Sequence, residues 1–319
     1  MRGLLRTPPE GVPTDCLISR IKARRSYLIG EWDRLLAAHE PLAGLPIAPW
    51  RQVPASAGKD RGWQALQYEH AWAFARMTEP LREIMAPFFW LGELKQLSSC
   101  LRKLSGGQGE SEQPLGESLL NSTIRDILKS ASSAMSAVQR LSRNLLPYHG
   151  GFARLPEEYQ KGGCGALETA LYDGSLAHIA VTSTHPVMTR YFSAQIDARN
   201  LAAIVKQRRW GGGSRPALLA GGTLRTALLE PLIERGDAAG LALPVTRFGT
   251  STLPDDPDQL ERILLASQGR EMKLLAREPS GVGAILSYLW HCGVEARNLG
   301  LLSRMNVAGM YAVERELVR

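Results

Sequence analysis

Residues 295–299 read Glu-Ala-Arg-Asn-Leu, and closely related strings occupy residues 197–201 (Asp-Ala-Arg-Asn-Leu) and 93–97 (Glu-Leu-Lys-Gln-Leu). The three strings lie about 100 residues apart, and agreement at a regular period is the mark of an internal repeat. Each string lies in a stretch rich in Leu, Ala, Arg and Glu, residues that favour helix. The sequence therefore predicts a threefold repeat of helical units.

The agreement extends to both sides of the five residues. Counting from the acid, an aromatic residue stands at −5, bases at +2 and +9, an amide at +3, a leucine at +4 and a glycine at +14. A glycine there predicts a left-handed residue that ends the helix. In order, the three copies are Phe88, Glu93, Lys95, Gln96, Leu97, Arg102 and Gly107; Phe192, Asp197, Arg199, Asn200, Leu201, Lys206 and Gly211; and Trp290, Glu295, Arg297, Asn298, Leu299, Arg304 and Gly309.

The motif gives each helix two different faces. At about 100° per residue, the acid, the amide and the leucine fall on one side and the two bases on the other. A carboxylate within an apolar face needs a partner, such as a helix N-terminus or an arginine of a neighbouring helix. The motif residues are therefore either structural residues of the core or direct contacts to a partner, and the sequence favours the structural interpretation.

The rest of the chain also follows a helical pattern. Clusters of Gly and Pro at residues 41–58, 105–116, 211–222 and 250–257 predict loops, and only residues 179–184 resemble a strand. We expect an all-α protein with three similar helical-bundle units at residues 1–112, 113–215 and 216–319. The principal predicted helices cover residues 16–39, 63–77, 119–146, 189–209, 224–235, 259–277 and 282–305.

The composition is that of an ordinary globular chain. Its 319 residues are 44% hydrophobic and 22% charged, with a formal net charge of +7, which excludes a disordered or collagen-like protein. The four cysteines are widely separated, so neither a disulfide framework nor a structural zinc site is expected. No apolar run approaches the length of about 20 residues that spans a membrane, and the N-terminus lacks a signal-peptide core. We expect a soluble, cytoplasmic chain.

Motifs of the common enzyme classes are missing from the sequence. The glycine clusters lack the Gly-Lys-Ser/Thr ending of a phosphate-binding loop, no G-x-S-x-G nucleophile motif occurs, and the histidines are scattered. His291 lies four residues before Glu295, where a local pair is favoured over a general acid and base because the other copies have Phe89 and Ser193. We expect no catalytic residue, cofactor or metal.

Two basic clusters remain. Residues 206–210 (Lys-Gln-Arg-Arg-Trp) and a group on the first predicted helix could contact phosphates, although solvated helix faces are favoured for both. We treat the second group as a possible basic interface; its members are Arg20, Lys22, Arg24 and Arg25.

The repeat resembles a known family. Residues 191–201 and 288–299, together with Gly309 and the ending at residues 314–319, are similar to the C-type subunit of the V/A-type rotary ATPases, which is the relative of the eukaryotic d-type subunit. Residues 16–25 resemble the first helix of that family. Ala202 and Gly300 stand where the family often has a base, which indicates a divergent branch.

The resemblance implies a funnel-shaped, all-helical protein with three related units around a pseudo-threefold axis, peripheral on the cytoplasmic face of the membrane. It also implies a non-catalytic adaptor that links the central-stalk subunits to the membrane proteolipid ring, and so couples ATP hydrolysis or synthesis to proton or sodium transport. Neither nucleic acid nor a small-molecule substrate is expected. The excess of bases would suit anionic headgroups or acidic stalk residues. The alternative is a free-standing helical-repeat scaffold that binds another protein or nucleic acid.

Overall fold

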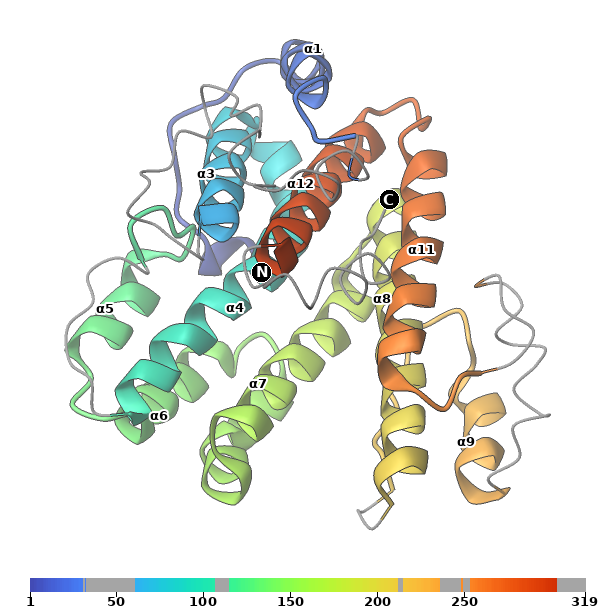
Figure 1. Ribbon diagram of the computed structural model, residues 1–319. Coiled ribbons are helices and arrows are strands. Elements are labelled where there is room, and N and C mark those ends of the chain that lie inside the picture. Colours follow the sequence, from blue (N-terminus) through green and yellow to red (C-terminus); the bar gives the residue numbers. More distant parts are fainter. Residues whose placement is uncertain are drawn as a thin grey trace. The chain divides into compact units, whose positions relative to one another are not determined.

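The structure, a computed structural model, describes residues 1–30, 32, 61–106, 115–211, 215–235, 248 and 253–302. Within these residues every regular element is a helix, so the predicted all-α class is confirmed (Figure 1). The chain divides into two compact units: unit 1 is Met1–Pro9 with Pro80–Gly236, and unit 2 is Glu10–Glu79 with Asp237–Arg319. The arrangement of three repeat units around an axis stays a prediction.

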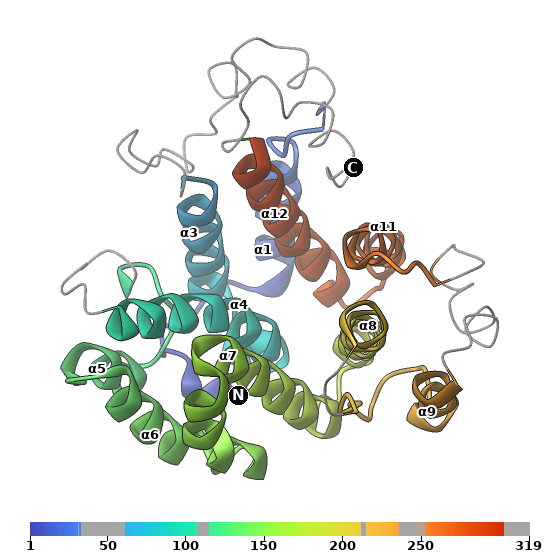
Figure 2. The same cartoon turned by 60° about the horizontal axis from the view of Figure 1, so that its bottom comes forward.

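Unit 1 is organised around α7, a helical segment that is kinked at Gly162 and Gly163. The helix α6, the short 3-10 helix η5 and α8 all contact α7, while α5 contacts α6 and α9 contacts α8 (Figures 1 and 2). The fully buried Trp90 of α4 donates a hydrogen bond of 2.8 Å to Ser175 of α7 and ties these two helices together. The elements are η1 (Arg2–Leu4), α4 (Glu79–Ser105, which starts one residue before the unit), α5 (Ser122–Ser130), α6 (Ala134–Leu145), η5 (Gly150–Arg154), α7 (Leu155–Thr182), α8 (Pro186–Trp210) and α9 (Thr226–Arg235).

The N-terminal segment is held to the approach to α5. The backbone N–H of Arg6 donates to the carbonyl of Leu119, and the N–H of Asn121 donates to the carbonyl of Leu4. An isolated antiparallel bridge, Leu5 to Leu120, lies between these two bonds. The first residues of the chain are therefore part of the packed structure of unit 1.

Two local predictions in unit 1 are wrong. The single helix expected over residues 119–146 is two helices, because Ser133 accepts the N–H of Ser136 and starts α6 afresh after an extended residue at Ala131. The strand expected at residues 179–184 is the end of α7, which continues to Thr182 with Ile179 fully buried. Tertiary burial outweighs the preference of a short β-branched run.

Unit 2 is centred on α12. The helices α3, α11 and α1 all contact it. The elements are α1 (Thr14–Arg25), α3 (Arg61–Arg76), α11 (Pro257–Leu275) and α12 (Val282–Leu302). The predicted helix over residues 16–39 is too long, because α1 ends at Arg25; its residues 33–39, the predicted loop at 41–58 and the end of the predicted helix over 282–305 lie outside the described residues.

A buried carboxylate joins three helices of unit 2. Glu69 of α3 accepts two hydrogen bonds from Arg24 of α1, at 3.2 and 3.0 Å, and one of 2.9 Å from the hydroxyl of Tyr288 on α12. The Arg24 guanidinium also lies 3.8 Å from the ring centroid of Trp72. Burial raises the pKa of Tyr288, and the nearby Cys292 and Glu69 raise it further. This network fixes α1 against the rest of unit 2.

In the part of the chain that the structure describes, no helix combines the length and the apolar character required to cross a membrane.

Candidate functional site

The acids of the first two motif copies are buried hydrogen-bond acceptors. Glu93 of α4 accepts from the Ser118 hydroxyl at 2.6 Å and from the N–H of Leu119 at 3.0 Å. Asp197 of α8 accepts from the N–H of Leu224 at 2.9 Å and from both the N–H and the hydroxyl of Thr223. Each carboxylate thus ties its motif helix to the segment that leads into a later helix, α5 or α9.

Electrostatics at Glu93 are governed by its burial. Burial raises the pKa of the Glu93 carboxyl, while its bonds to Ser118 and Leu119 and the charge of Arg6 oppose that rise. At Asp197 the approach of the chain depends on a glycine, because a Cβ at Gly222 would overlap the Asp197 carboxylate. A residue without a side chain is therefore required directly before Thr223.

The third acid makes a comparable tie in unit 2. Glu295 of α12 is buried and accepts the backbone N–H of Ile29, just beyond α1, at 3.2 Å. The sequence suggested His291 as the local partner of Glu295. Instead, Nδ1 of His291 donates a hydrogen bond of 2.6 Å to the carbonyl of Ser287, one turn earlier. In all three copies the acid holds a backbone N–H from elsewhere in the chain.

The remaining residues of the apolar face are also in the interior. Asn200 makes two hydrogen bonds to the backbone of Leu219, donating at 2.9 Å and accepting at 2.8 Å. Among the leucines, Leu299 is half-buried and the other two are fully buried. The amides Gln96 and Asn298 are buried as well, and so are the motif aromatics Phe88, Phe192 and Trp290.

Three of the motif bases, all arginines, form ion pairs with a neighbouring helix. Arg199 makes two bonds of 2.7 and 2.6 Å to Asp173 of α7, and Arg297 makes one of 3.0 Å to Glu261 of α11. Arg102 likewise makes two bonds, of 2.6 and 2.5 Å, to Glu168 of α7. Because the Arg102 side chain is 63% exposed, this pair contributes little to stability.

A groove in unit 1 collects the bases of two motif copies. Its volume is about 850 Å³, and residues of α4, α7 and α8 form its walls. Burial raises the pKa of Tyr172 on its α7 wall to about 12; the charge of Asp173 adds to this rise and that of Arg199 opposes it. The charged residues that line the groove are the bases Lys95, Arg102, Arg199 and Lys206 and the acids Glu168 and Asp173. We call this feature the basic groove.

The possible basic interface on α1 is divided by the structure. Arg20, Lys22 and Arg25 are exposed, whereas Arg24 turns inward to Glu69. The cluster therefore offers three outward cations rather than four.

The helix-ending glycines are described in one copy. Gly211 ends α8 with φ +55° and ψ 172°, so its φ is positive as predicted but its ψ is extended rather than left-handed helical. Arg304 of the motif and the glycines Gly107 and Gly309 lie outside the described residues.

The partners of the motif residues were not predicted from the sequence. Ser118-Leu119 and Thr223-Leu224 are both a hydroxyl residue followed by leucine, and each follows its motif acid by about 25 residues. That second repeated string was a detectable signal. The acids Glu168, Asp173 and Glu261 lie in no repeated string. Only the packing of α7 and α11 shows that they pair with the motif arginines.

Comparison with protein families finds a match over most of the chain. A family model described as the ATP synthase (C/AC39) subunit matches residues 64–313. A search of curated proteins found no match. The matched residues include all three copies of the motif and the basic groove.

Proposed function

Because the chain belongs to the ATP synthase C/AC39 subunit family, we propose that it is the non-catalytic central-rotor adaptor of a V/A-type ATPase or ATP synthase. In this role it links the central stalk to the membrane proteolipid ring, on the cytoplasmic face of the membrane. It couples ATP hydrolysis or synthesis to the transport of protons or sodium ions.

The observation that carries this proposal is the division of charge on the motif helices. The acids Glu93 and Asp197 are internal and hold backbone N–H groups of later segments. The bases of the same helices line the open basic groove. An adaptor that transmits torque needs both features, because internal ties stiffen the body and outward charges offer a specific contact.

The basic groove suits an acidic partner surface. Four bases and two acids line it, and the two ion pairs hold Arg102 and Arg199 in place along the α7 wall. A partner with acidic side chains on a helix would meet an excess of positive charge there, which favours association and fixes its register. We assign the groove to the contact with a central-stalk subunit.

The exposed bases of α1 suit the contact with the membrane proteolipid ring. Arg20, Lys22 and Arg25 are free to approach anionic headgroups or acidic residues beside the proteolipid ring. A charge-reversed variant at these three positions that still assembles with the ring would exclude α1 from that contact.

Affinity purification of the full-length chain from its native cells tests the proposal. We expect the central-stalk and proteolipid subunits to co-purify with the chain in detergent. When Lys95 and Lys206 are both exchanged for Glu, we expect the central-stalk subunits no longer to co-purify. Lys129→Glu, an equally exposed change on α5 outside the groove, is the matched control. Recovery of a soluble monomer with unrelated partners would contradict the adaptor and support the free-standing scaffold.

A further inference from the structure

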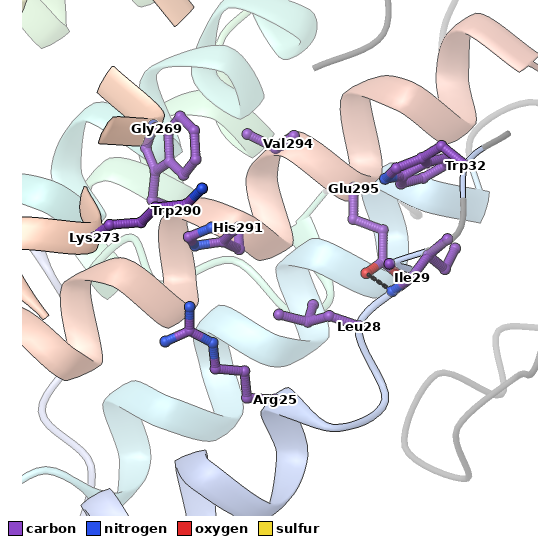
Figure 3. Close-up of a pocket in the computed structure, with 11 residues that line it drawn as sticks. Arg25, Leu28, Ile29, Trp32, Gly269, Lys273, Trp290, His291, Val294 and Glu295 are labelled. Atoms are coloured by element: carbon purple, nitrogen blue, oxygen red, sulfur yellow. Dashed lines mark hydrogen bonds between the residues drawn. The ribbon is translucent and has the colours of Figure 1, made fainter. Parts of the chain in front are cut away.

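A second pocket lies in unit 2, beside the third copy of the motif (Figure 3). Its volume is about 340 Å³, within the range of small-ligand sites. Residues of α1, α11 and α12 and of the segment after α1 line it. Neither the motif pattern nor the adaptor role accounts for this pocket.

Three basic side chains from three helices meet at the pocket. Arg25 reaches from α1 towards His291 of α12, and Lys273 approaches from α11 beside Trp290 (Figure 3). The side chains of Arg25 and Lys273 have no ion-pair or hydrogen-bond partner among the described residues, whereas neighbouring Arg24 is committed to Glu69. Two unneutralised cations around one small cavity favour an anion.

The histidine supplies a third donor when its ring is protonated. A carbonyl oxygen can only accept, so the 2.6 Å bond to Ser287 places a proton on Nδ1 of His291. Nε2 is then the ring atom available to a ligand, and it becomes an N–H donor when the ring is protonated. Burial lowers the pKa of His291, the bond to Ser287 opposes that fall, and the charges of Arg25 and Lys273 lower the pKa further. An anion that neutralises these cations would therefore raise the pKa of His291.

Among the described residues that line the pocket, the acid is Glu295. Glu295 accepts the N–H of Ile29, shown dashed in Figure 3. On α3, which also packs against α12, Glu69 is bonded to Arg24 and Tyr288. The described charged groups that face His291 are thus Arg25, Lys273 and Glu295.

Among the three motif copies, only the third has a histidine at this position. At the position of His291, the first copy has the fully buried Phe89. The second copy has Ser193, whose hydroxyl donates a hydrogen bond of 2.9 Å to the carbonyl of Gly221. The aromatic, the acid and the amide around these positions keep their types, so the histidine departs from a pattern that the helix otherwise retains.

We propose that this pocket binds a tetrahedral oxyanion of the phosphate type, held by Arg25, Lys273 and Nε2 of His291 against the indole of Trp290. Three donors on separate helices surround a tetrahedral ion, whereas a planar carboxylate is matched by one guanidinium. The anion is either free phosphate or the phosphate of a lipid headgroup. Arg25 is shared with the proposed contact of α1, whereas Lys273 and His291 belong to this site alone.

Calorimetric titration of the full chain with inorganic phosphate at constant ionic strength is the first test. We expect Arg25→Gln and Lys273→Gln each to weaken binding about tenfold, the loss expected for a hydrogen bond to a charged group. Lys22→Gln removes the same charge from the exposed face of α1, outside the pocket, and should bind as the wild type does. Both altered side chains are exposed, so melting temperatures should be unchanged.

Titration with sulfate at several pH values isolates the role of His291, because the charge of sulfate does not change between pH 8 and pH 5.5. We expect sulfate affinity to rise between pH 8 and pH 5.5 in the wild type, and this rise to be absent in His291→Gln. Acetate should bind more weakly than either oxyanion. Acetate binding as tight as phosphate binding would overturn the assignment in favour of an acidic side chain.

Vesicles separate the two sources of the anion. Phosphatidylcholine vesicles with and without phosphatidylglycerol are sedimented with the wild type and the Arg25→Gln and Lys273→Gln variants. Binding of vesicles that depends on both residues identifies a lipid headgroup, and phosphate binding without vesicle binding identifies a free ion. Equal binding of all variants in both experiments would overturn the proposal.

Discussion

The carboxylate of Asp197 accepts a hydrogen bond of 2.9 Å from the backbone N–H of Leu224, across 27 residues of sequence. Glu93 makes the same kind of bond to Leu119 at 3.0 Å. A buried acid that satisfies backbone donors replaces the secondary-structure bonds that those donors lack. The acids of these two motif copies are therefore structural ties.

Exchange of Asp197 for Asn should destabilise unit 1. The amide keeps the shape of the side chain but loses the charge and replaces one acceptor by a donor, which faces the N–H of either Thr223 or Leu224. We expect a loss of about 2–3 kcal/mol in the free energy of unfolding, measured in urea.

Asp126→Asn is the matched control for this change, because Asp126 is an exposed acid on α5 of the same unit. It should alter the free energy of unfolding by less than about 0.5 kcal/mol. An Asp197→Asn variant with unchanged unfolding but impaired assembly would instead place Asp197 in an interface.

Removal of the Tyr288 hydroxyl should weaken unit 2. Tyr288→Phe takes one hydrogen bond from the buried Glu69 but leaves its pair with Arg24, so a loss of about 2 kcal/mol is expected. Arg24→Ala leaves the buried carboxylate without its counter-charge and should cost about 3 kcal/mol or more. Urea unfolding measures both, and equal effects would contradict the stronger role of the ion pair.

Unit 2 should lose stability in mild acid because of His70. Burial lowers the pKa of His70 on α3 from 6.5 to about 4, so the unfolded chain takes up a proton between these values and the folded chain does not. The stabilisation of the folded state that arises from the lowered pKa of His70 is complete above pH 6.5 and is lost as the pH falls. The free energy of unfolding should be about 2 kcal/mol lower at pH 5 for this reason. The difference in unfolding free energy between the wild type and His70→Gln, measured from pH 7.5 to pH 5, should shrink by that amount. Parallel pH profiles would contradict the shift.

Charge reversal in the basic groove should separate assembly from stability. Lys95 and Lys206 are exposed at the groove, so their joint exchange for Glu should change the free energy of unfolding by less than about 1 kcal/mol. We expect the affinity for the partner to fall and its salt dependence to decrease, as measured by binding at several ionic strengths. Unchanged binding would exclude the groove as the contact.

Sequence periodicity predicted the helical class and the inward and outward faces of the motif. The acid, amide and leucine of α8 are buried and its Arg199 faces the groove, because a helix fixes the direction of each side chain through its position. The break at Ala131–Ser133 was missed because serine can occupy a helix or cap one, and only tertiary packing decides between them.

The partners of the motif residues depend on contacts that periodicity does not encode. Asp173 reaches Arg199 because α7 and α8 pack together, and Glu69 reaches Arg24 because α1 and α3 both meet α12. The pocket at His291 likewise brings together α1, α11 and α12. Such sites need the relative placement of helices, which a single helical pattern leaves open.

The central claim, that this chain couples ATP turnover to ion transport, is tested most directly in vesicles that contain the purified rotary complex. ATP hydrolysis and ion uptake are measured together in the complete complex, in the complex stripped of this chain, and after the chain is added back. We predict that the stripped complex hydrolyses ATP without transporting ions and that the wild-type chain restores transport, whereas the Lys95 and Lys206 charge-reversed chain does not. Undiminished ATP-driven transport in the stripped complex would contradict the account.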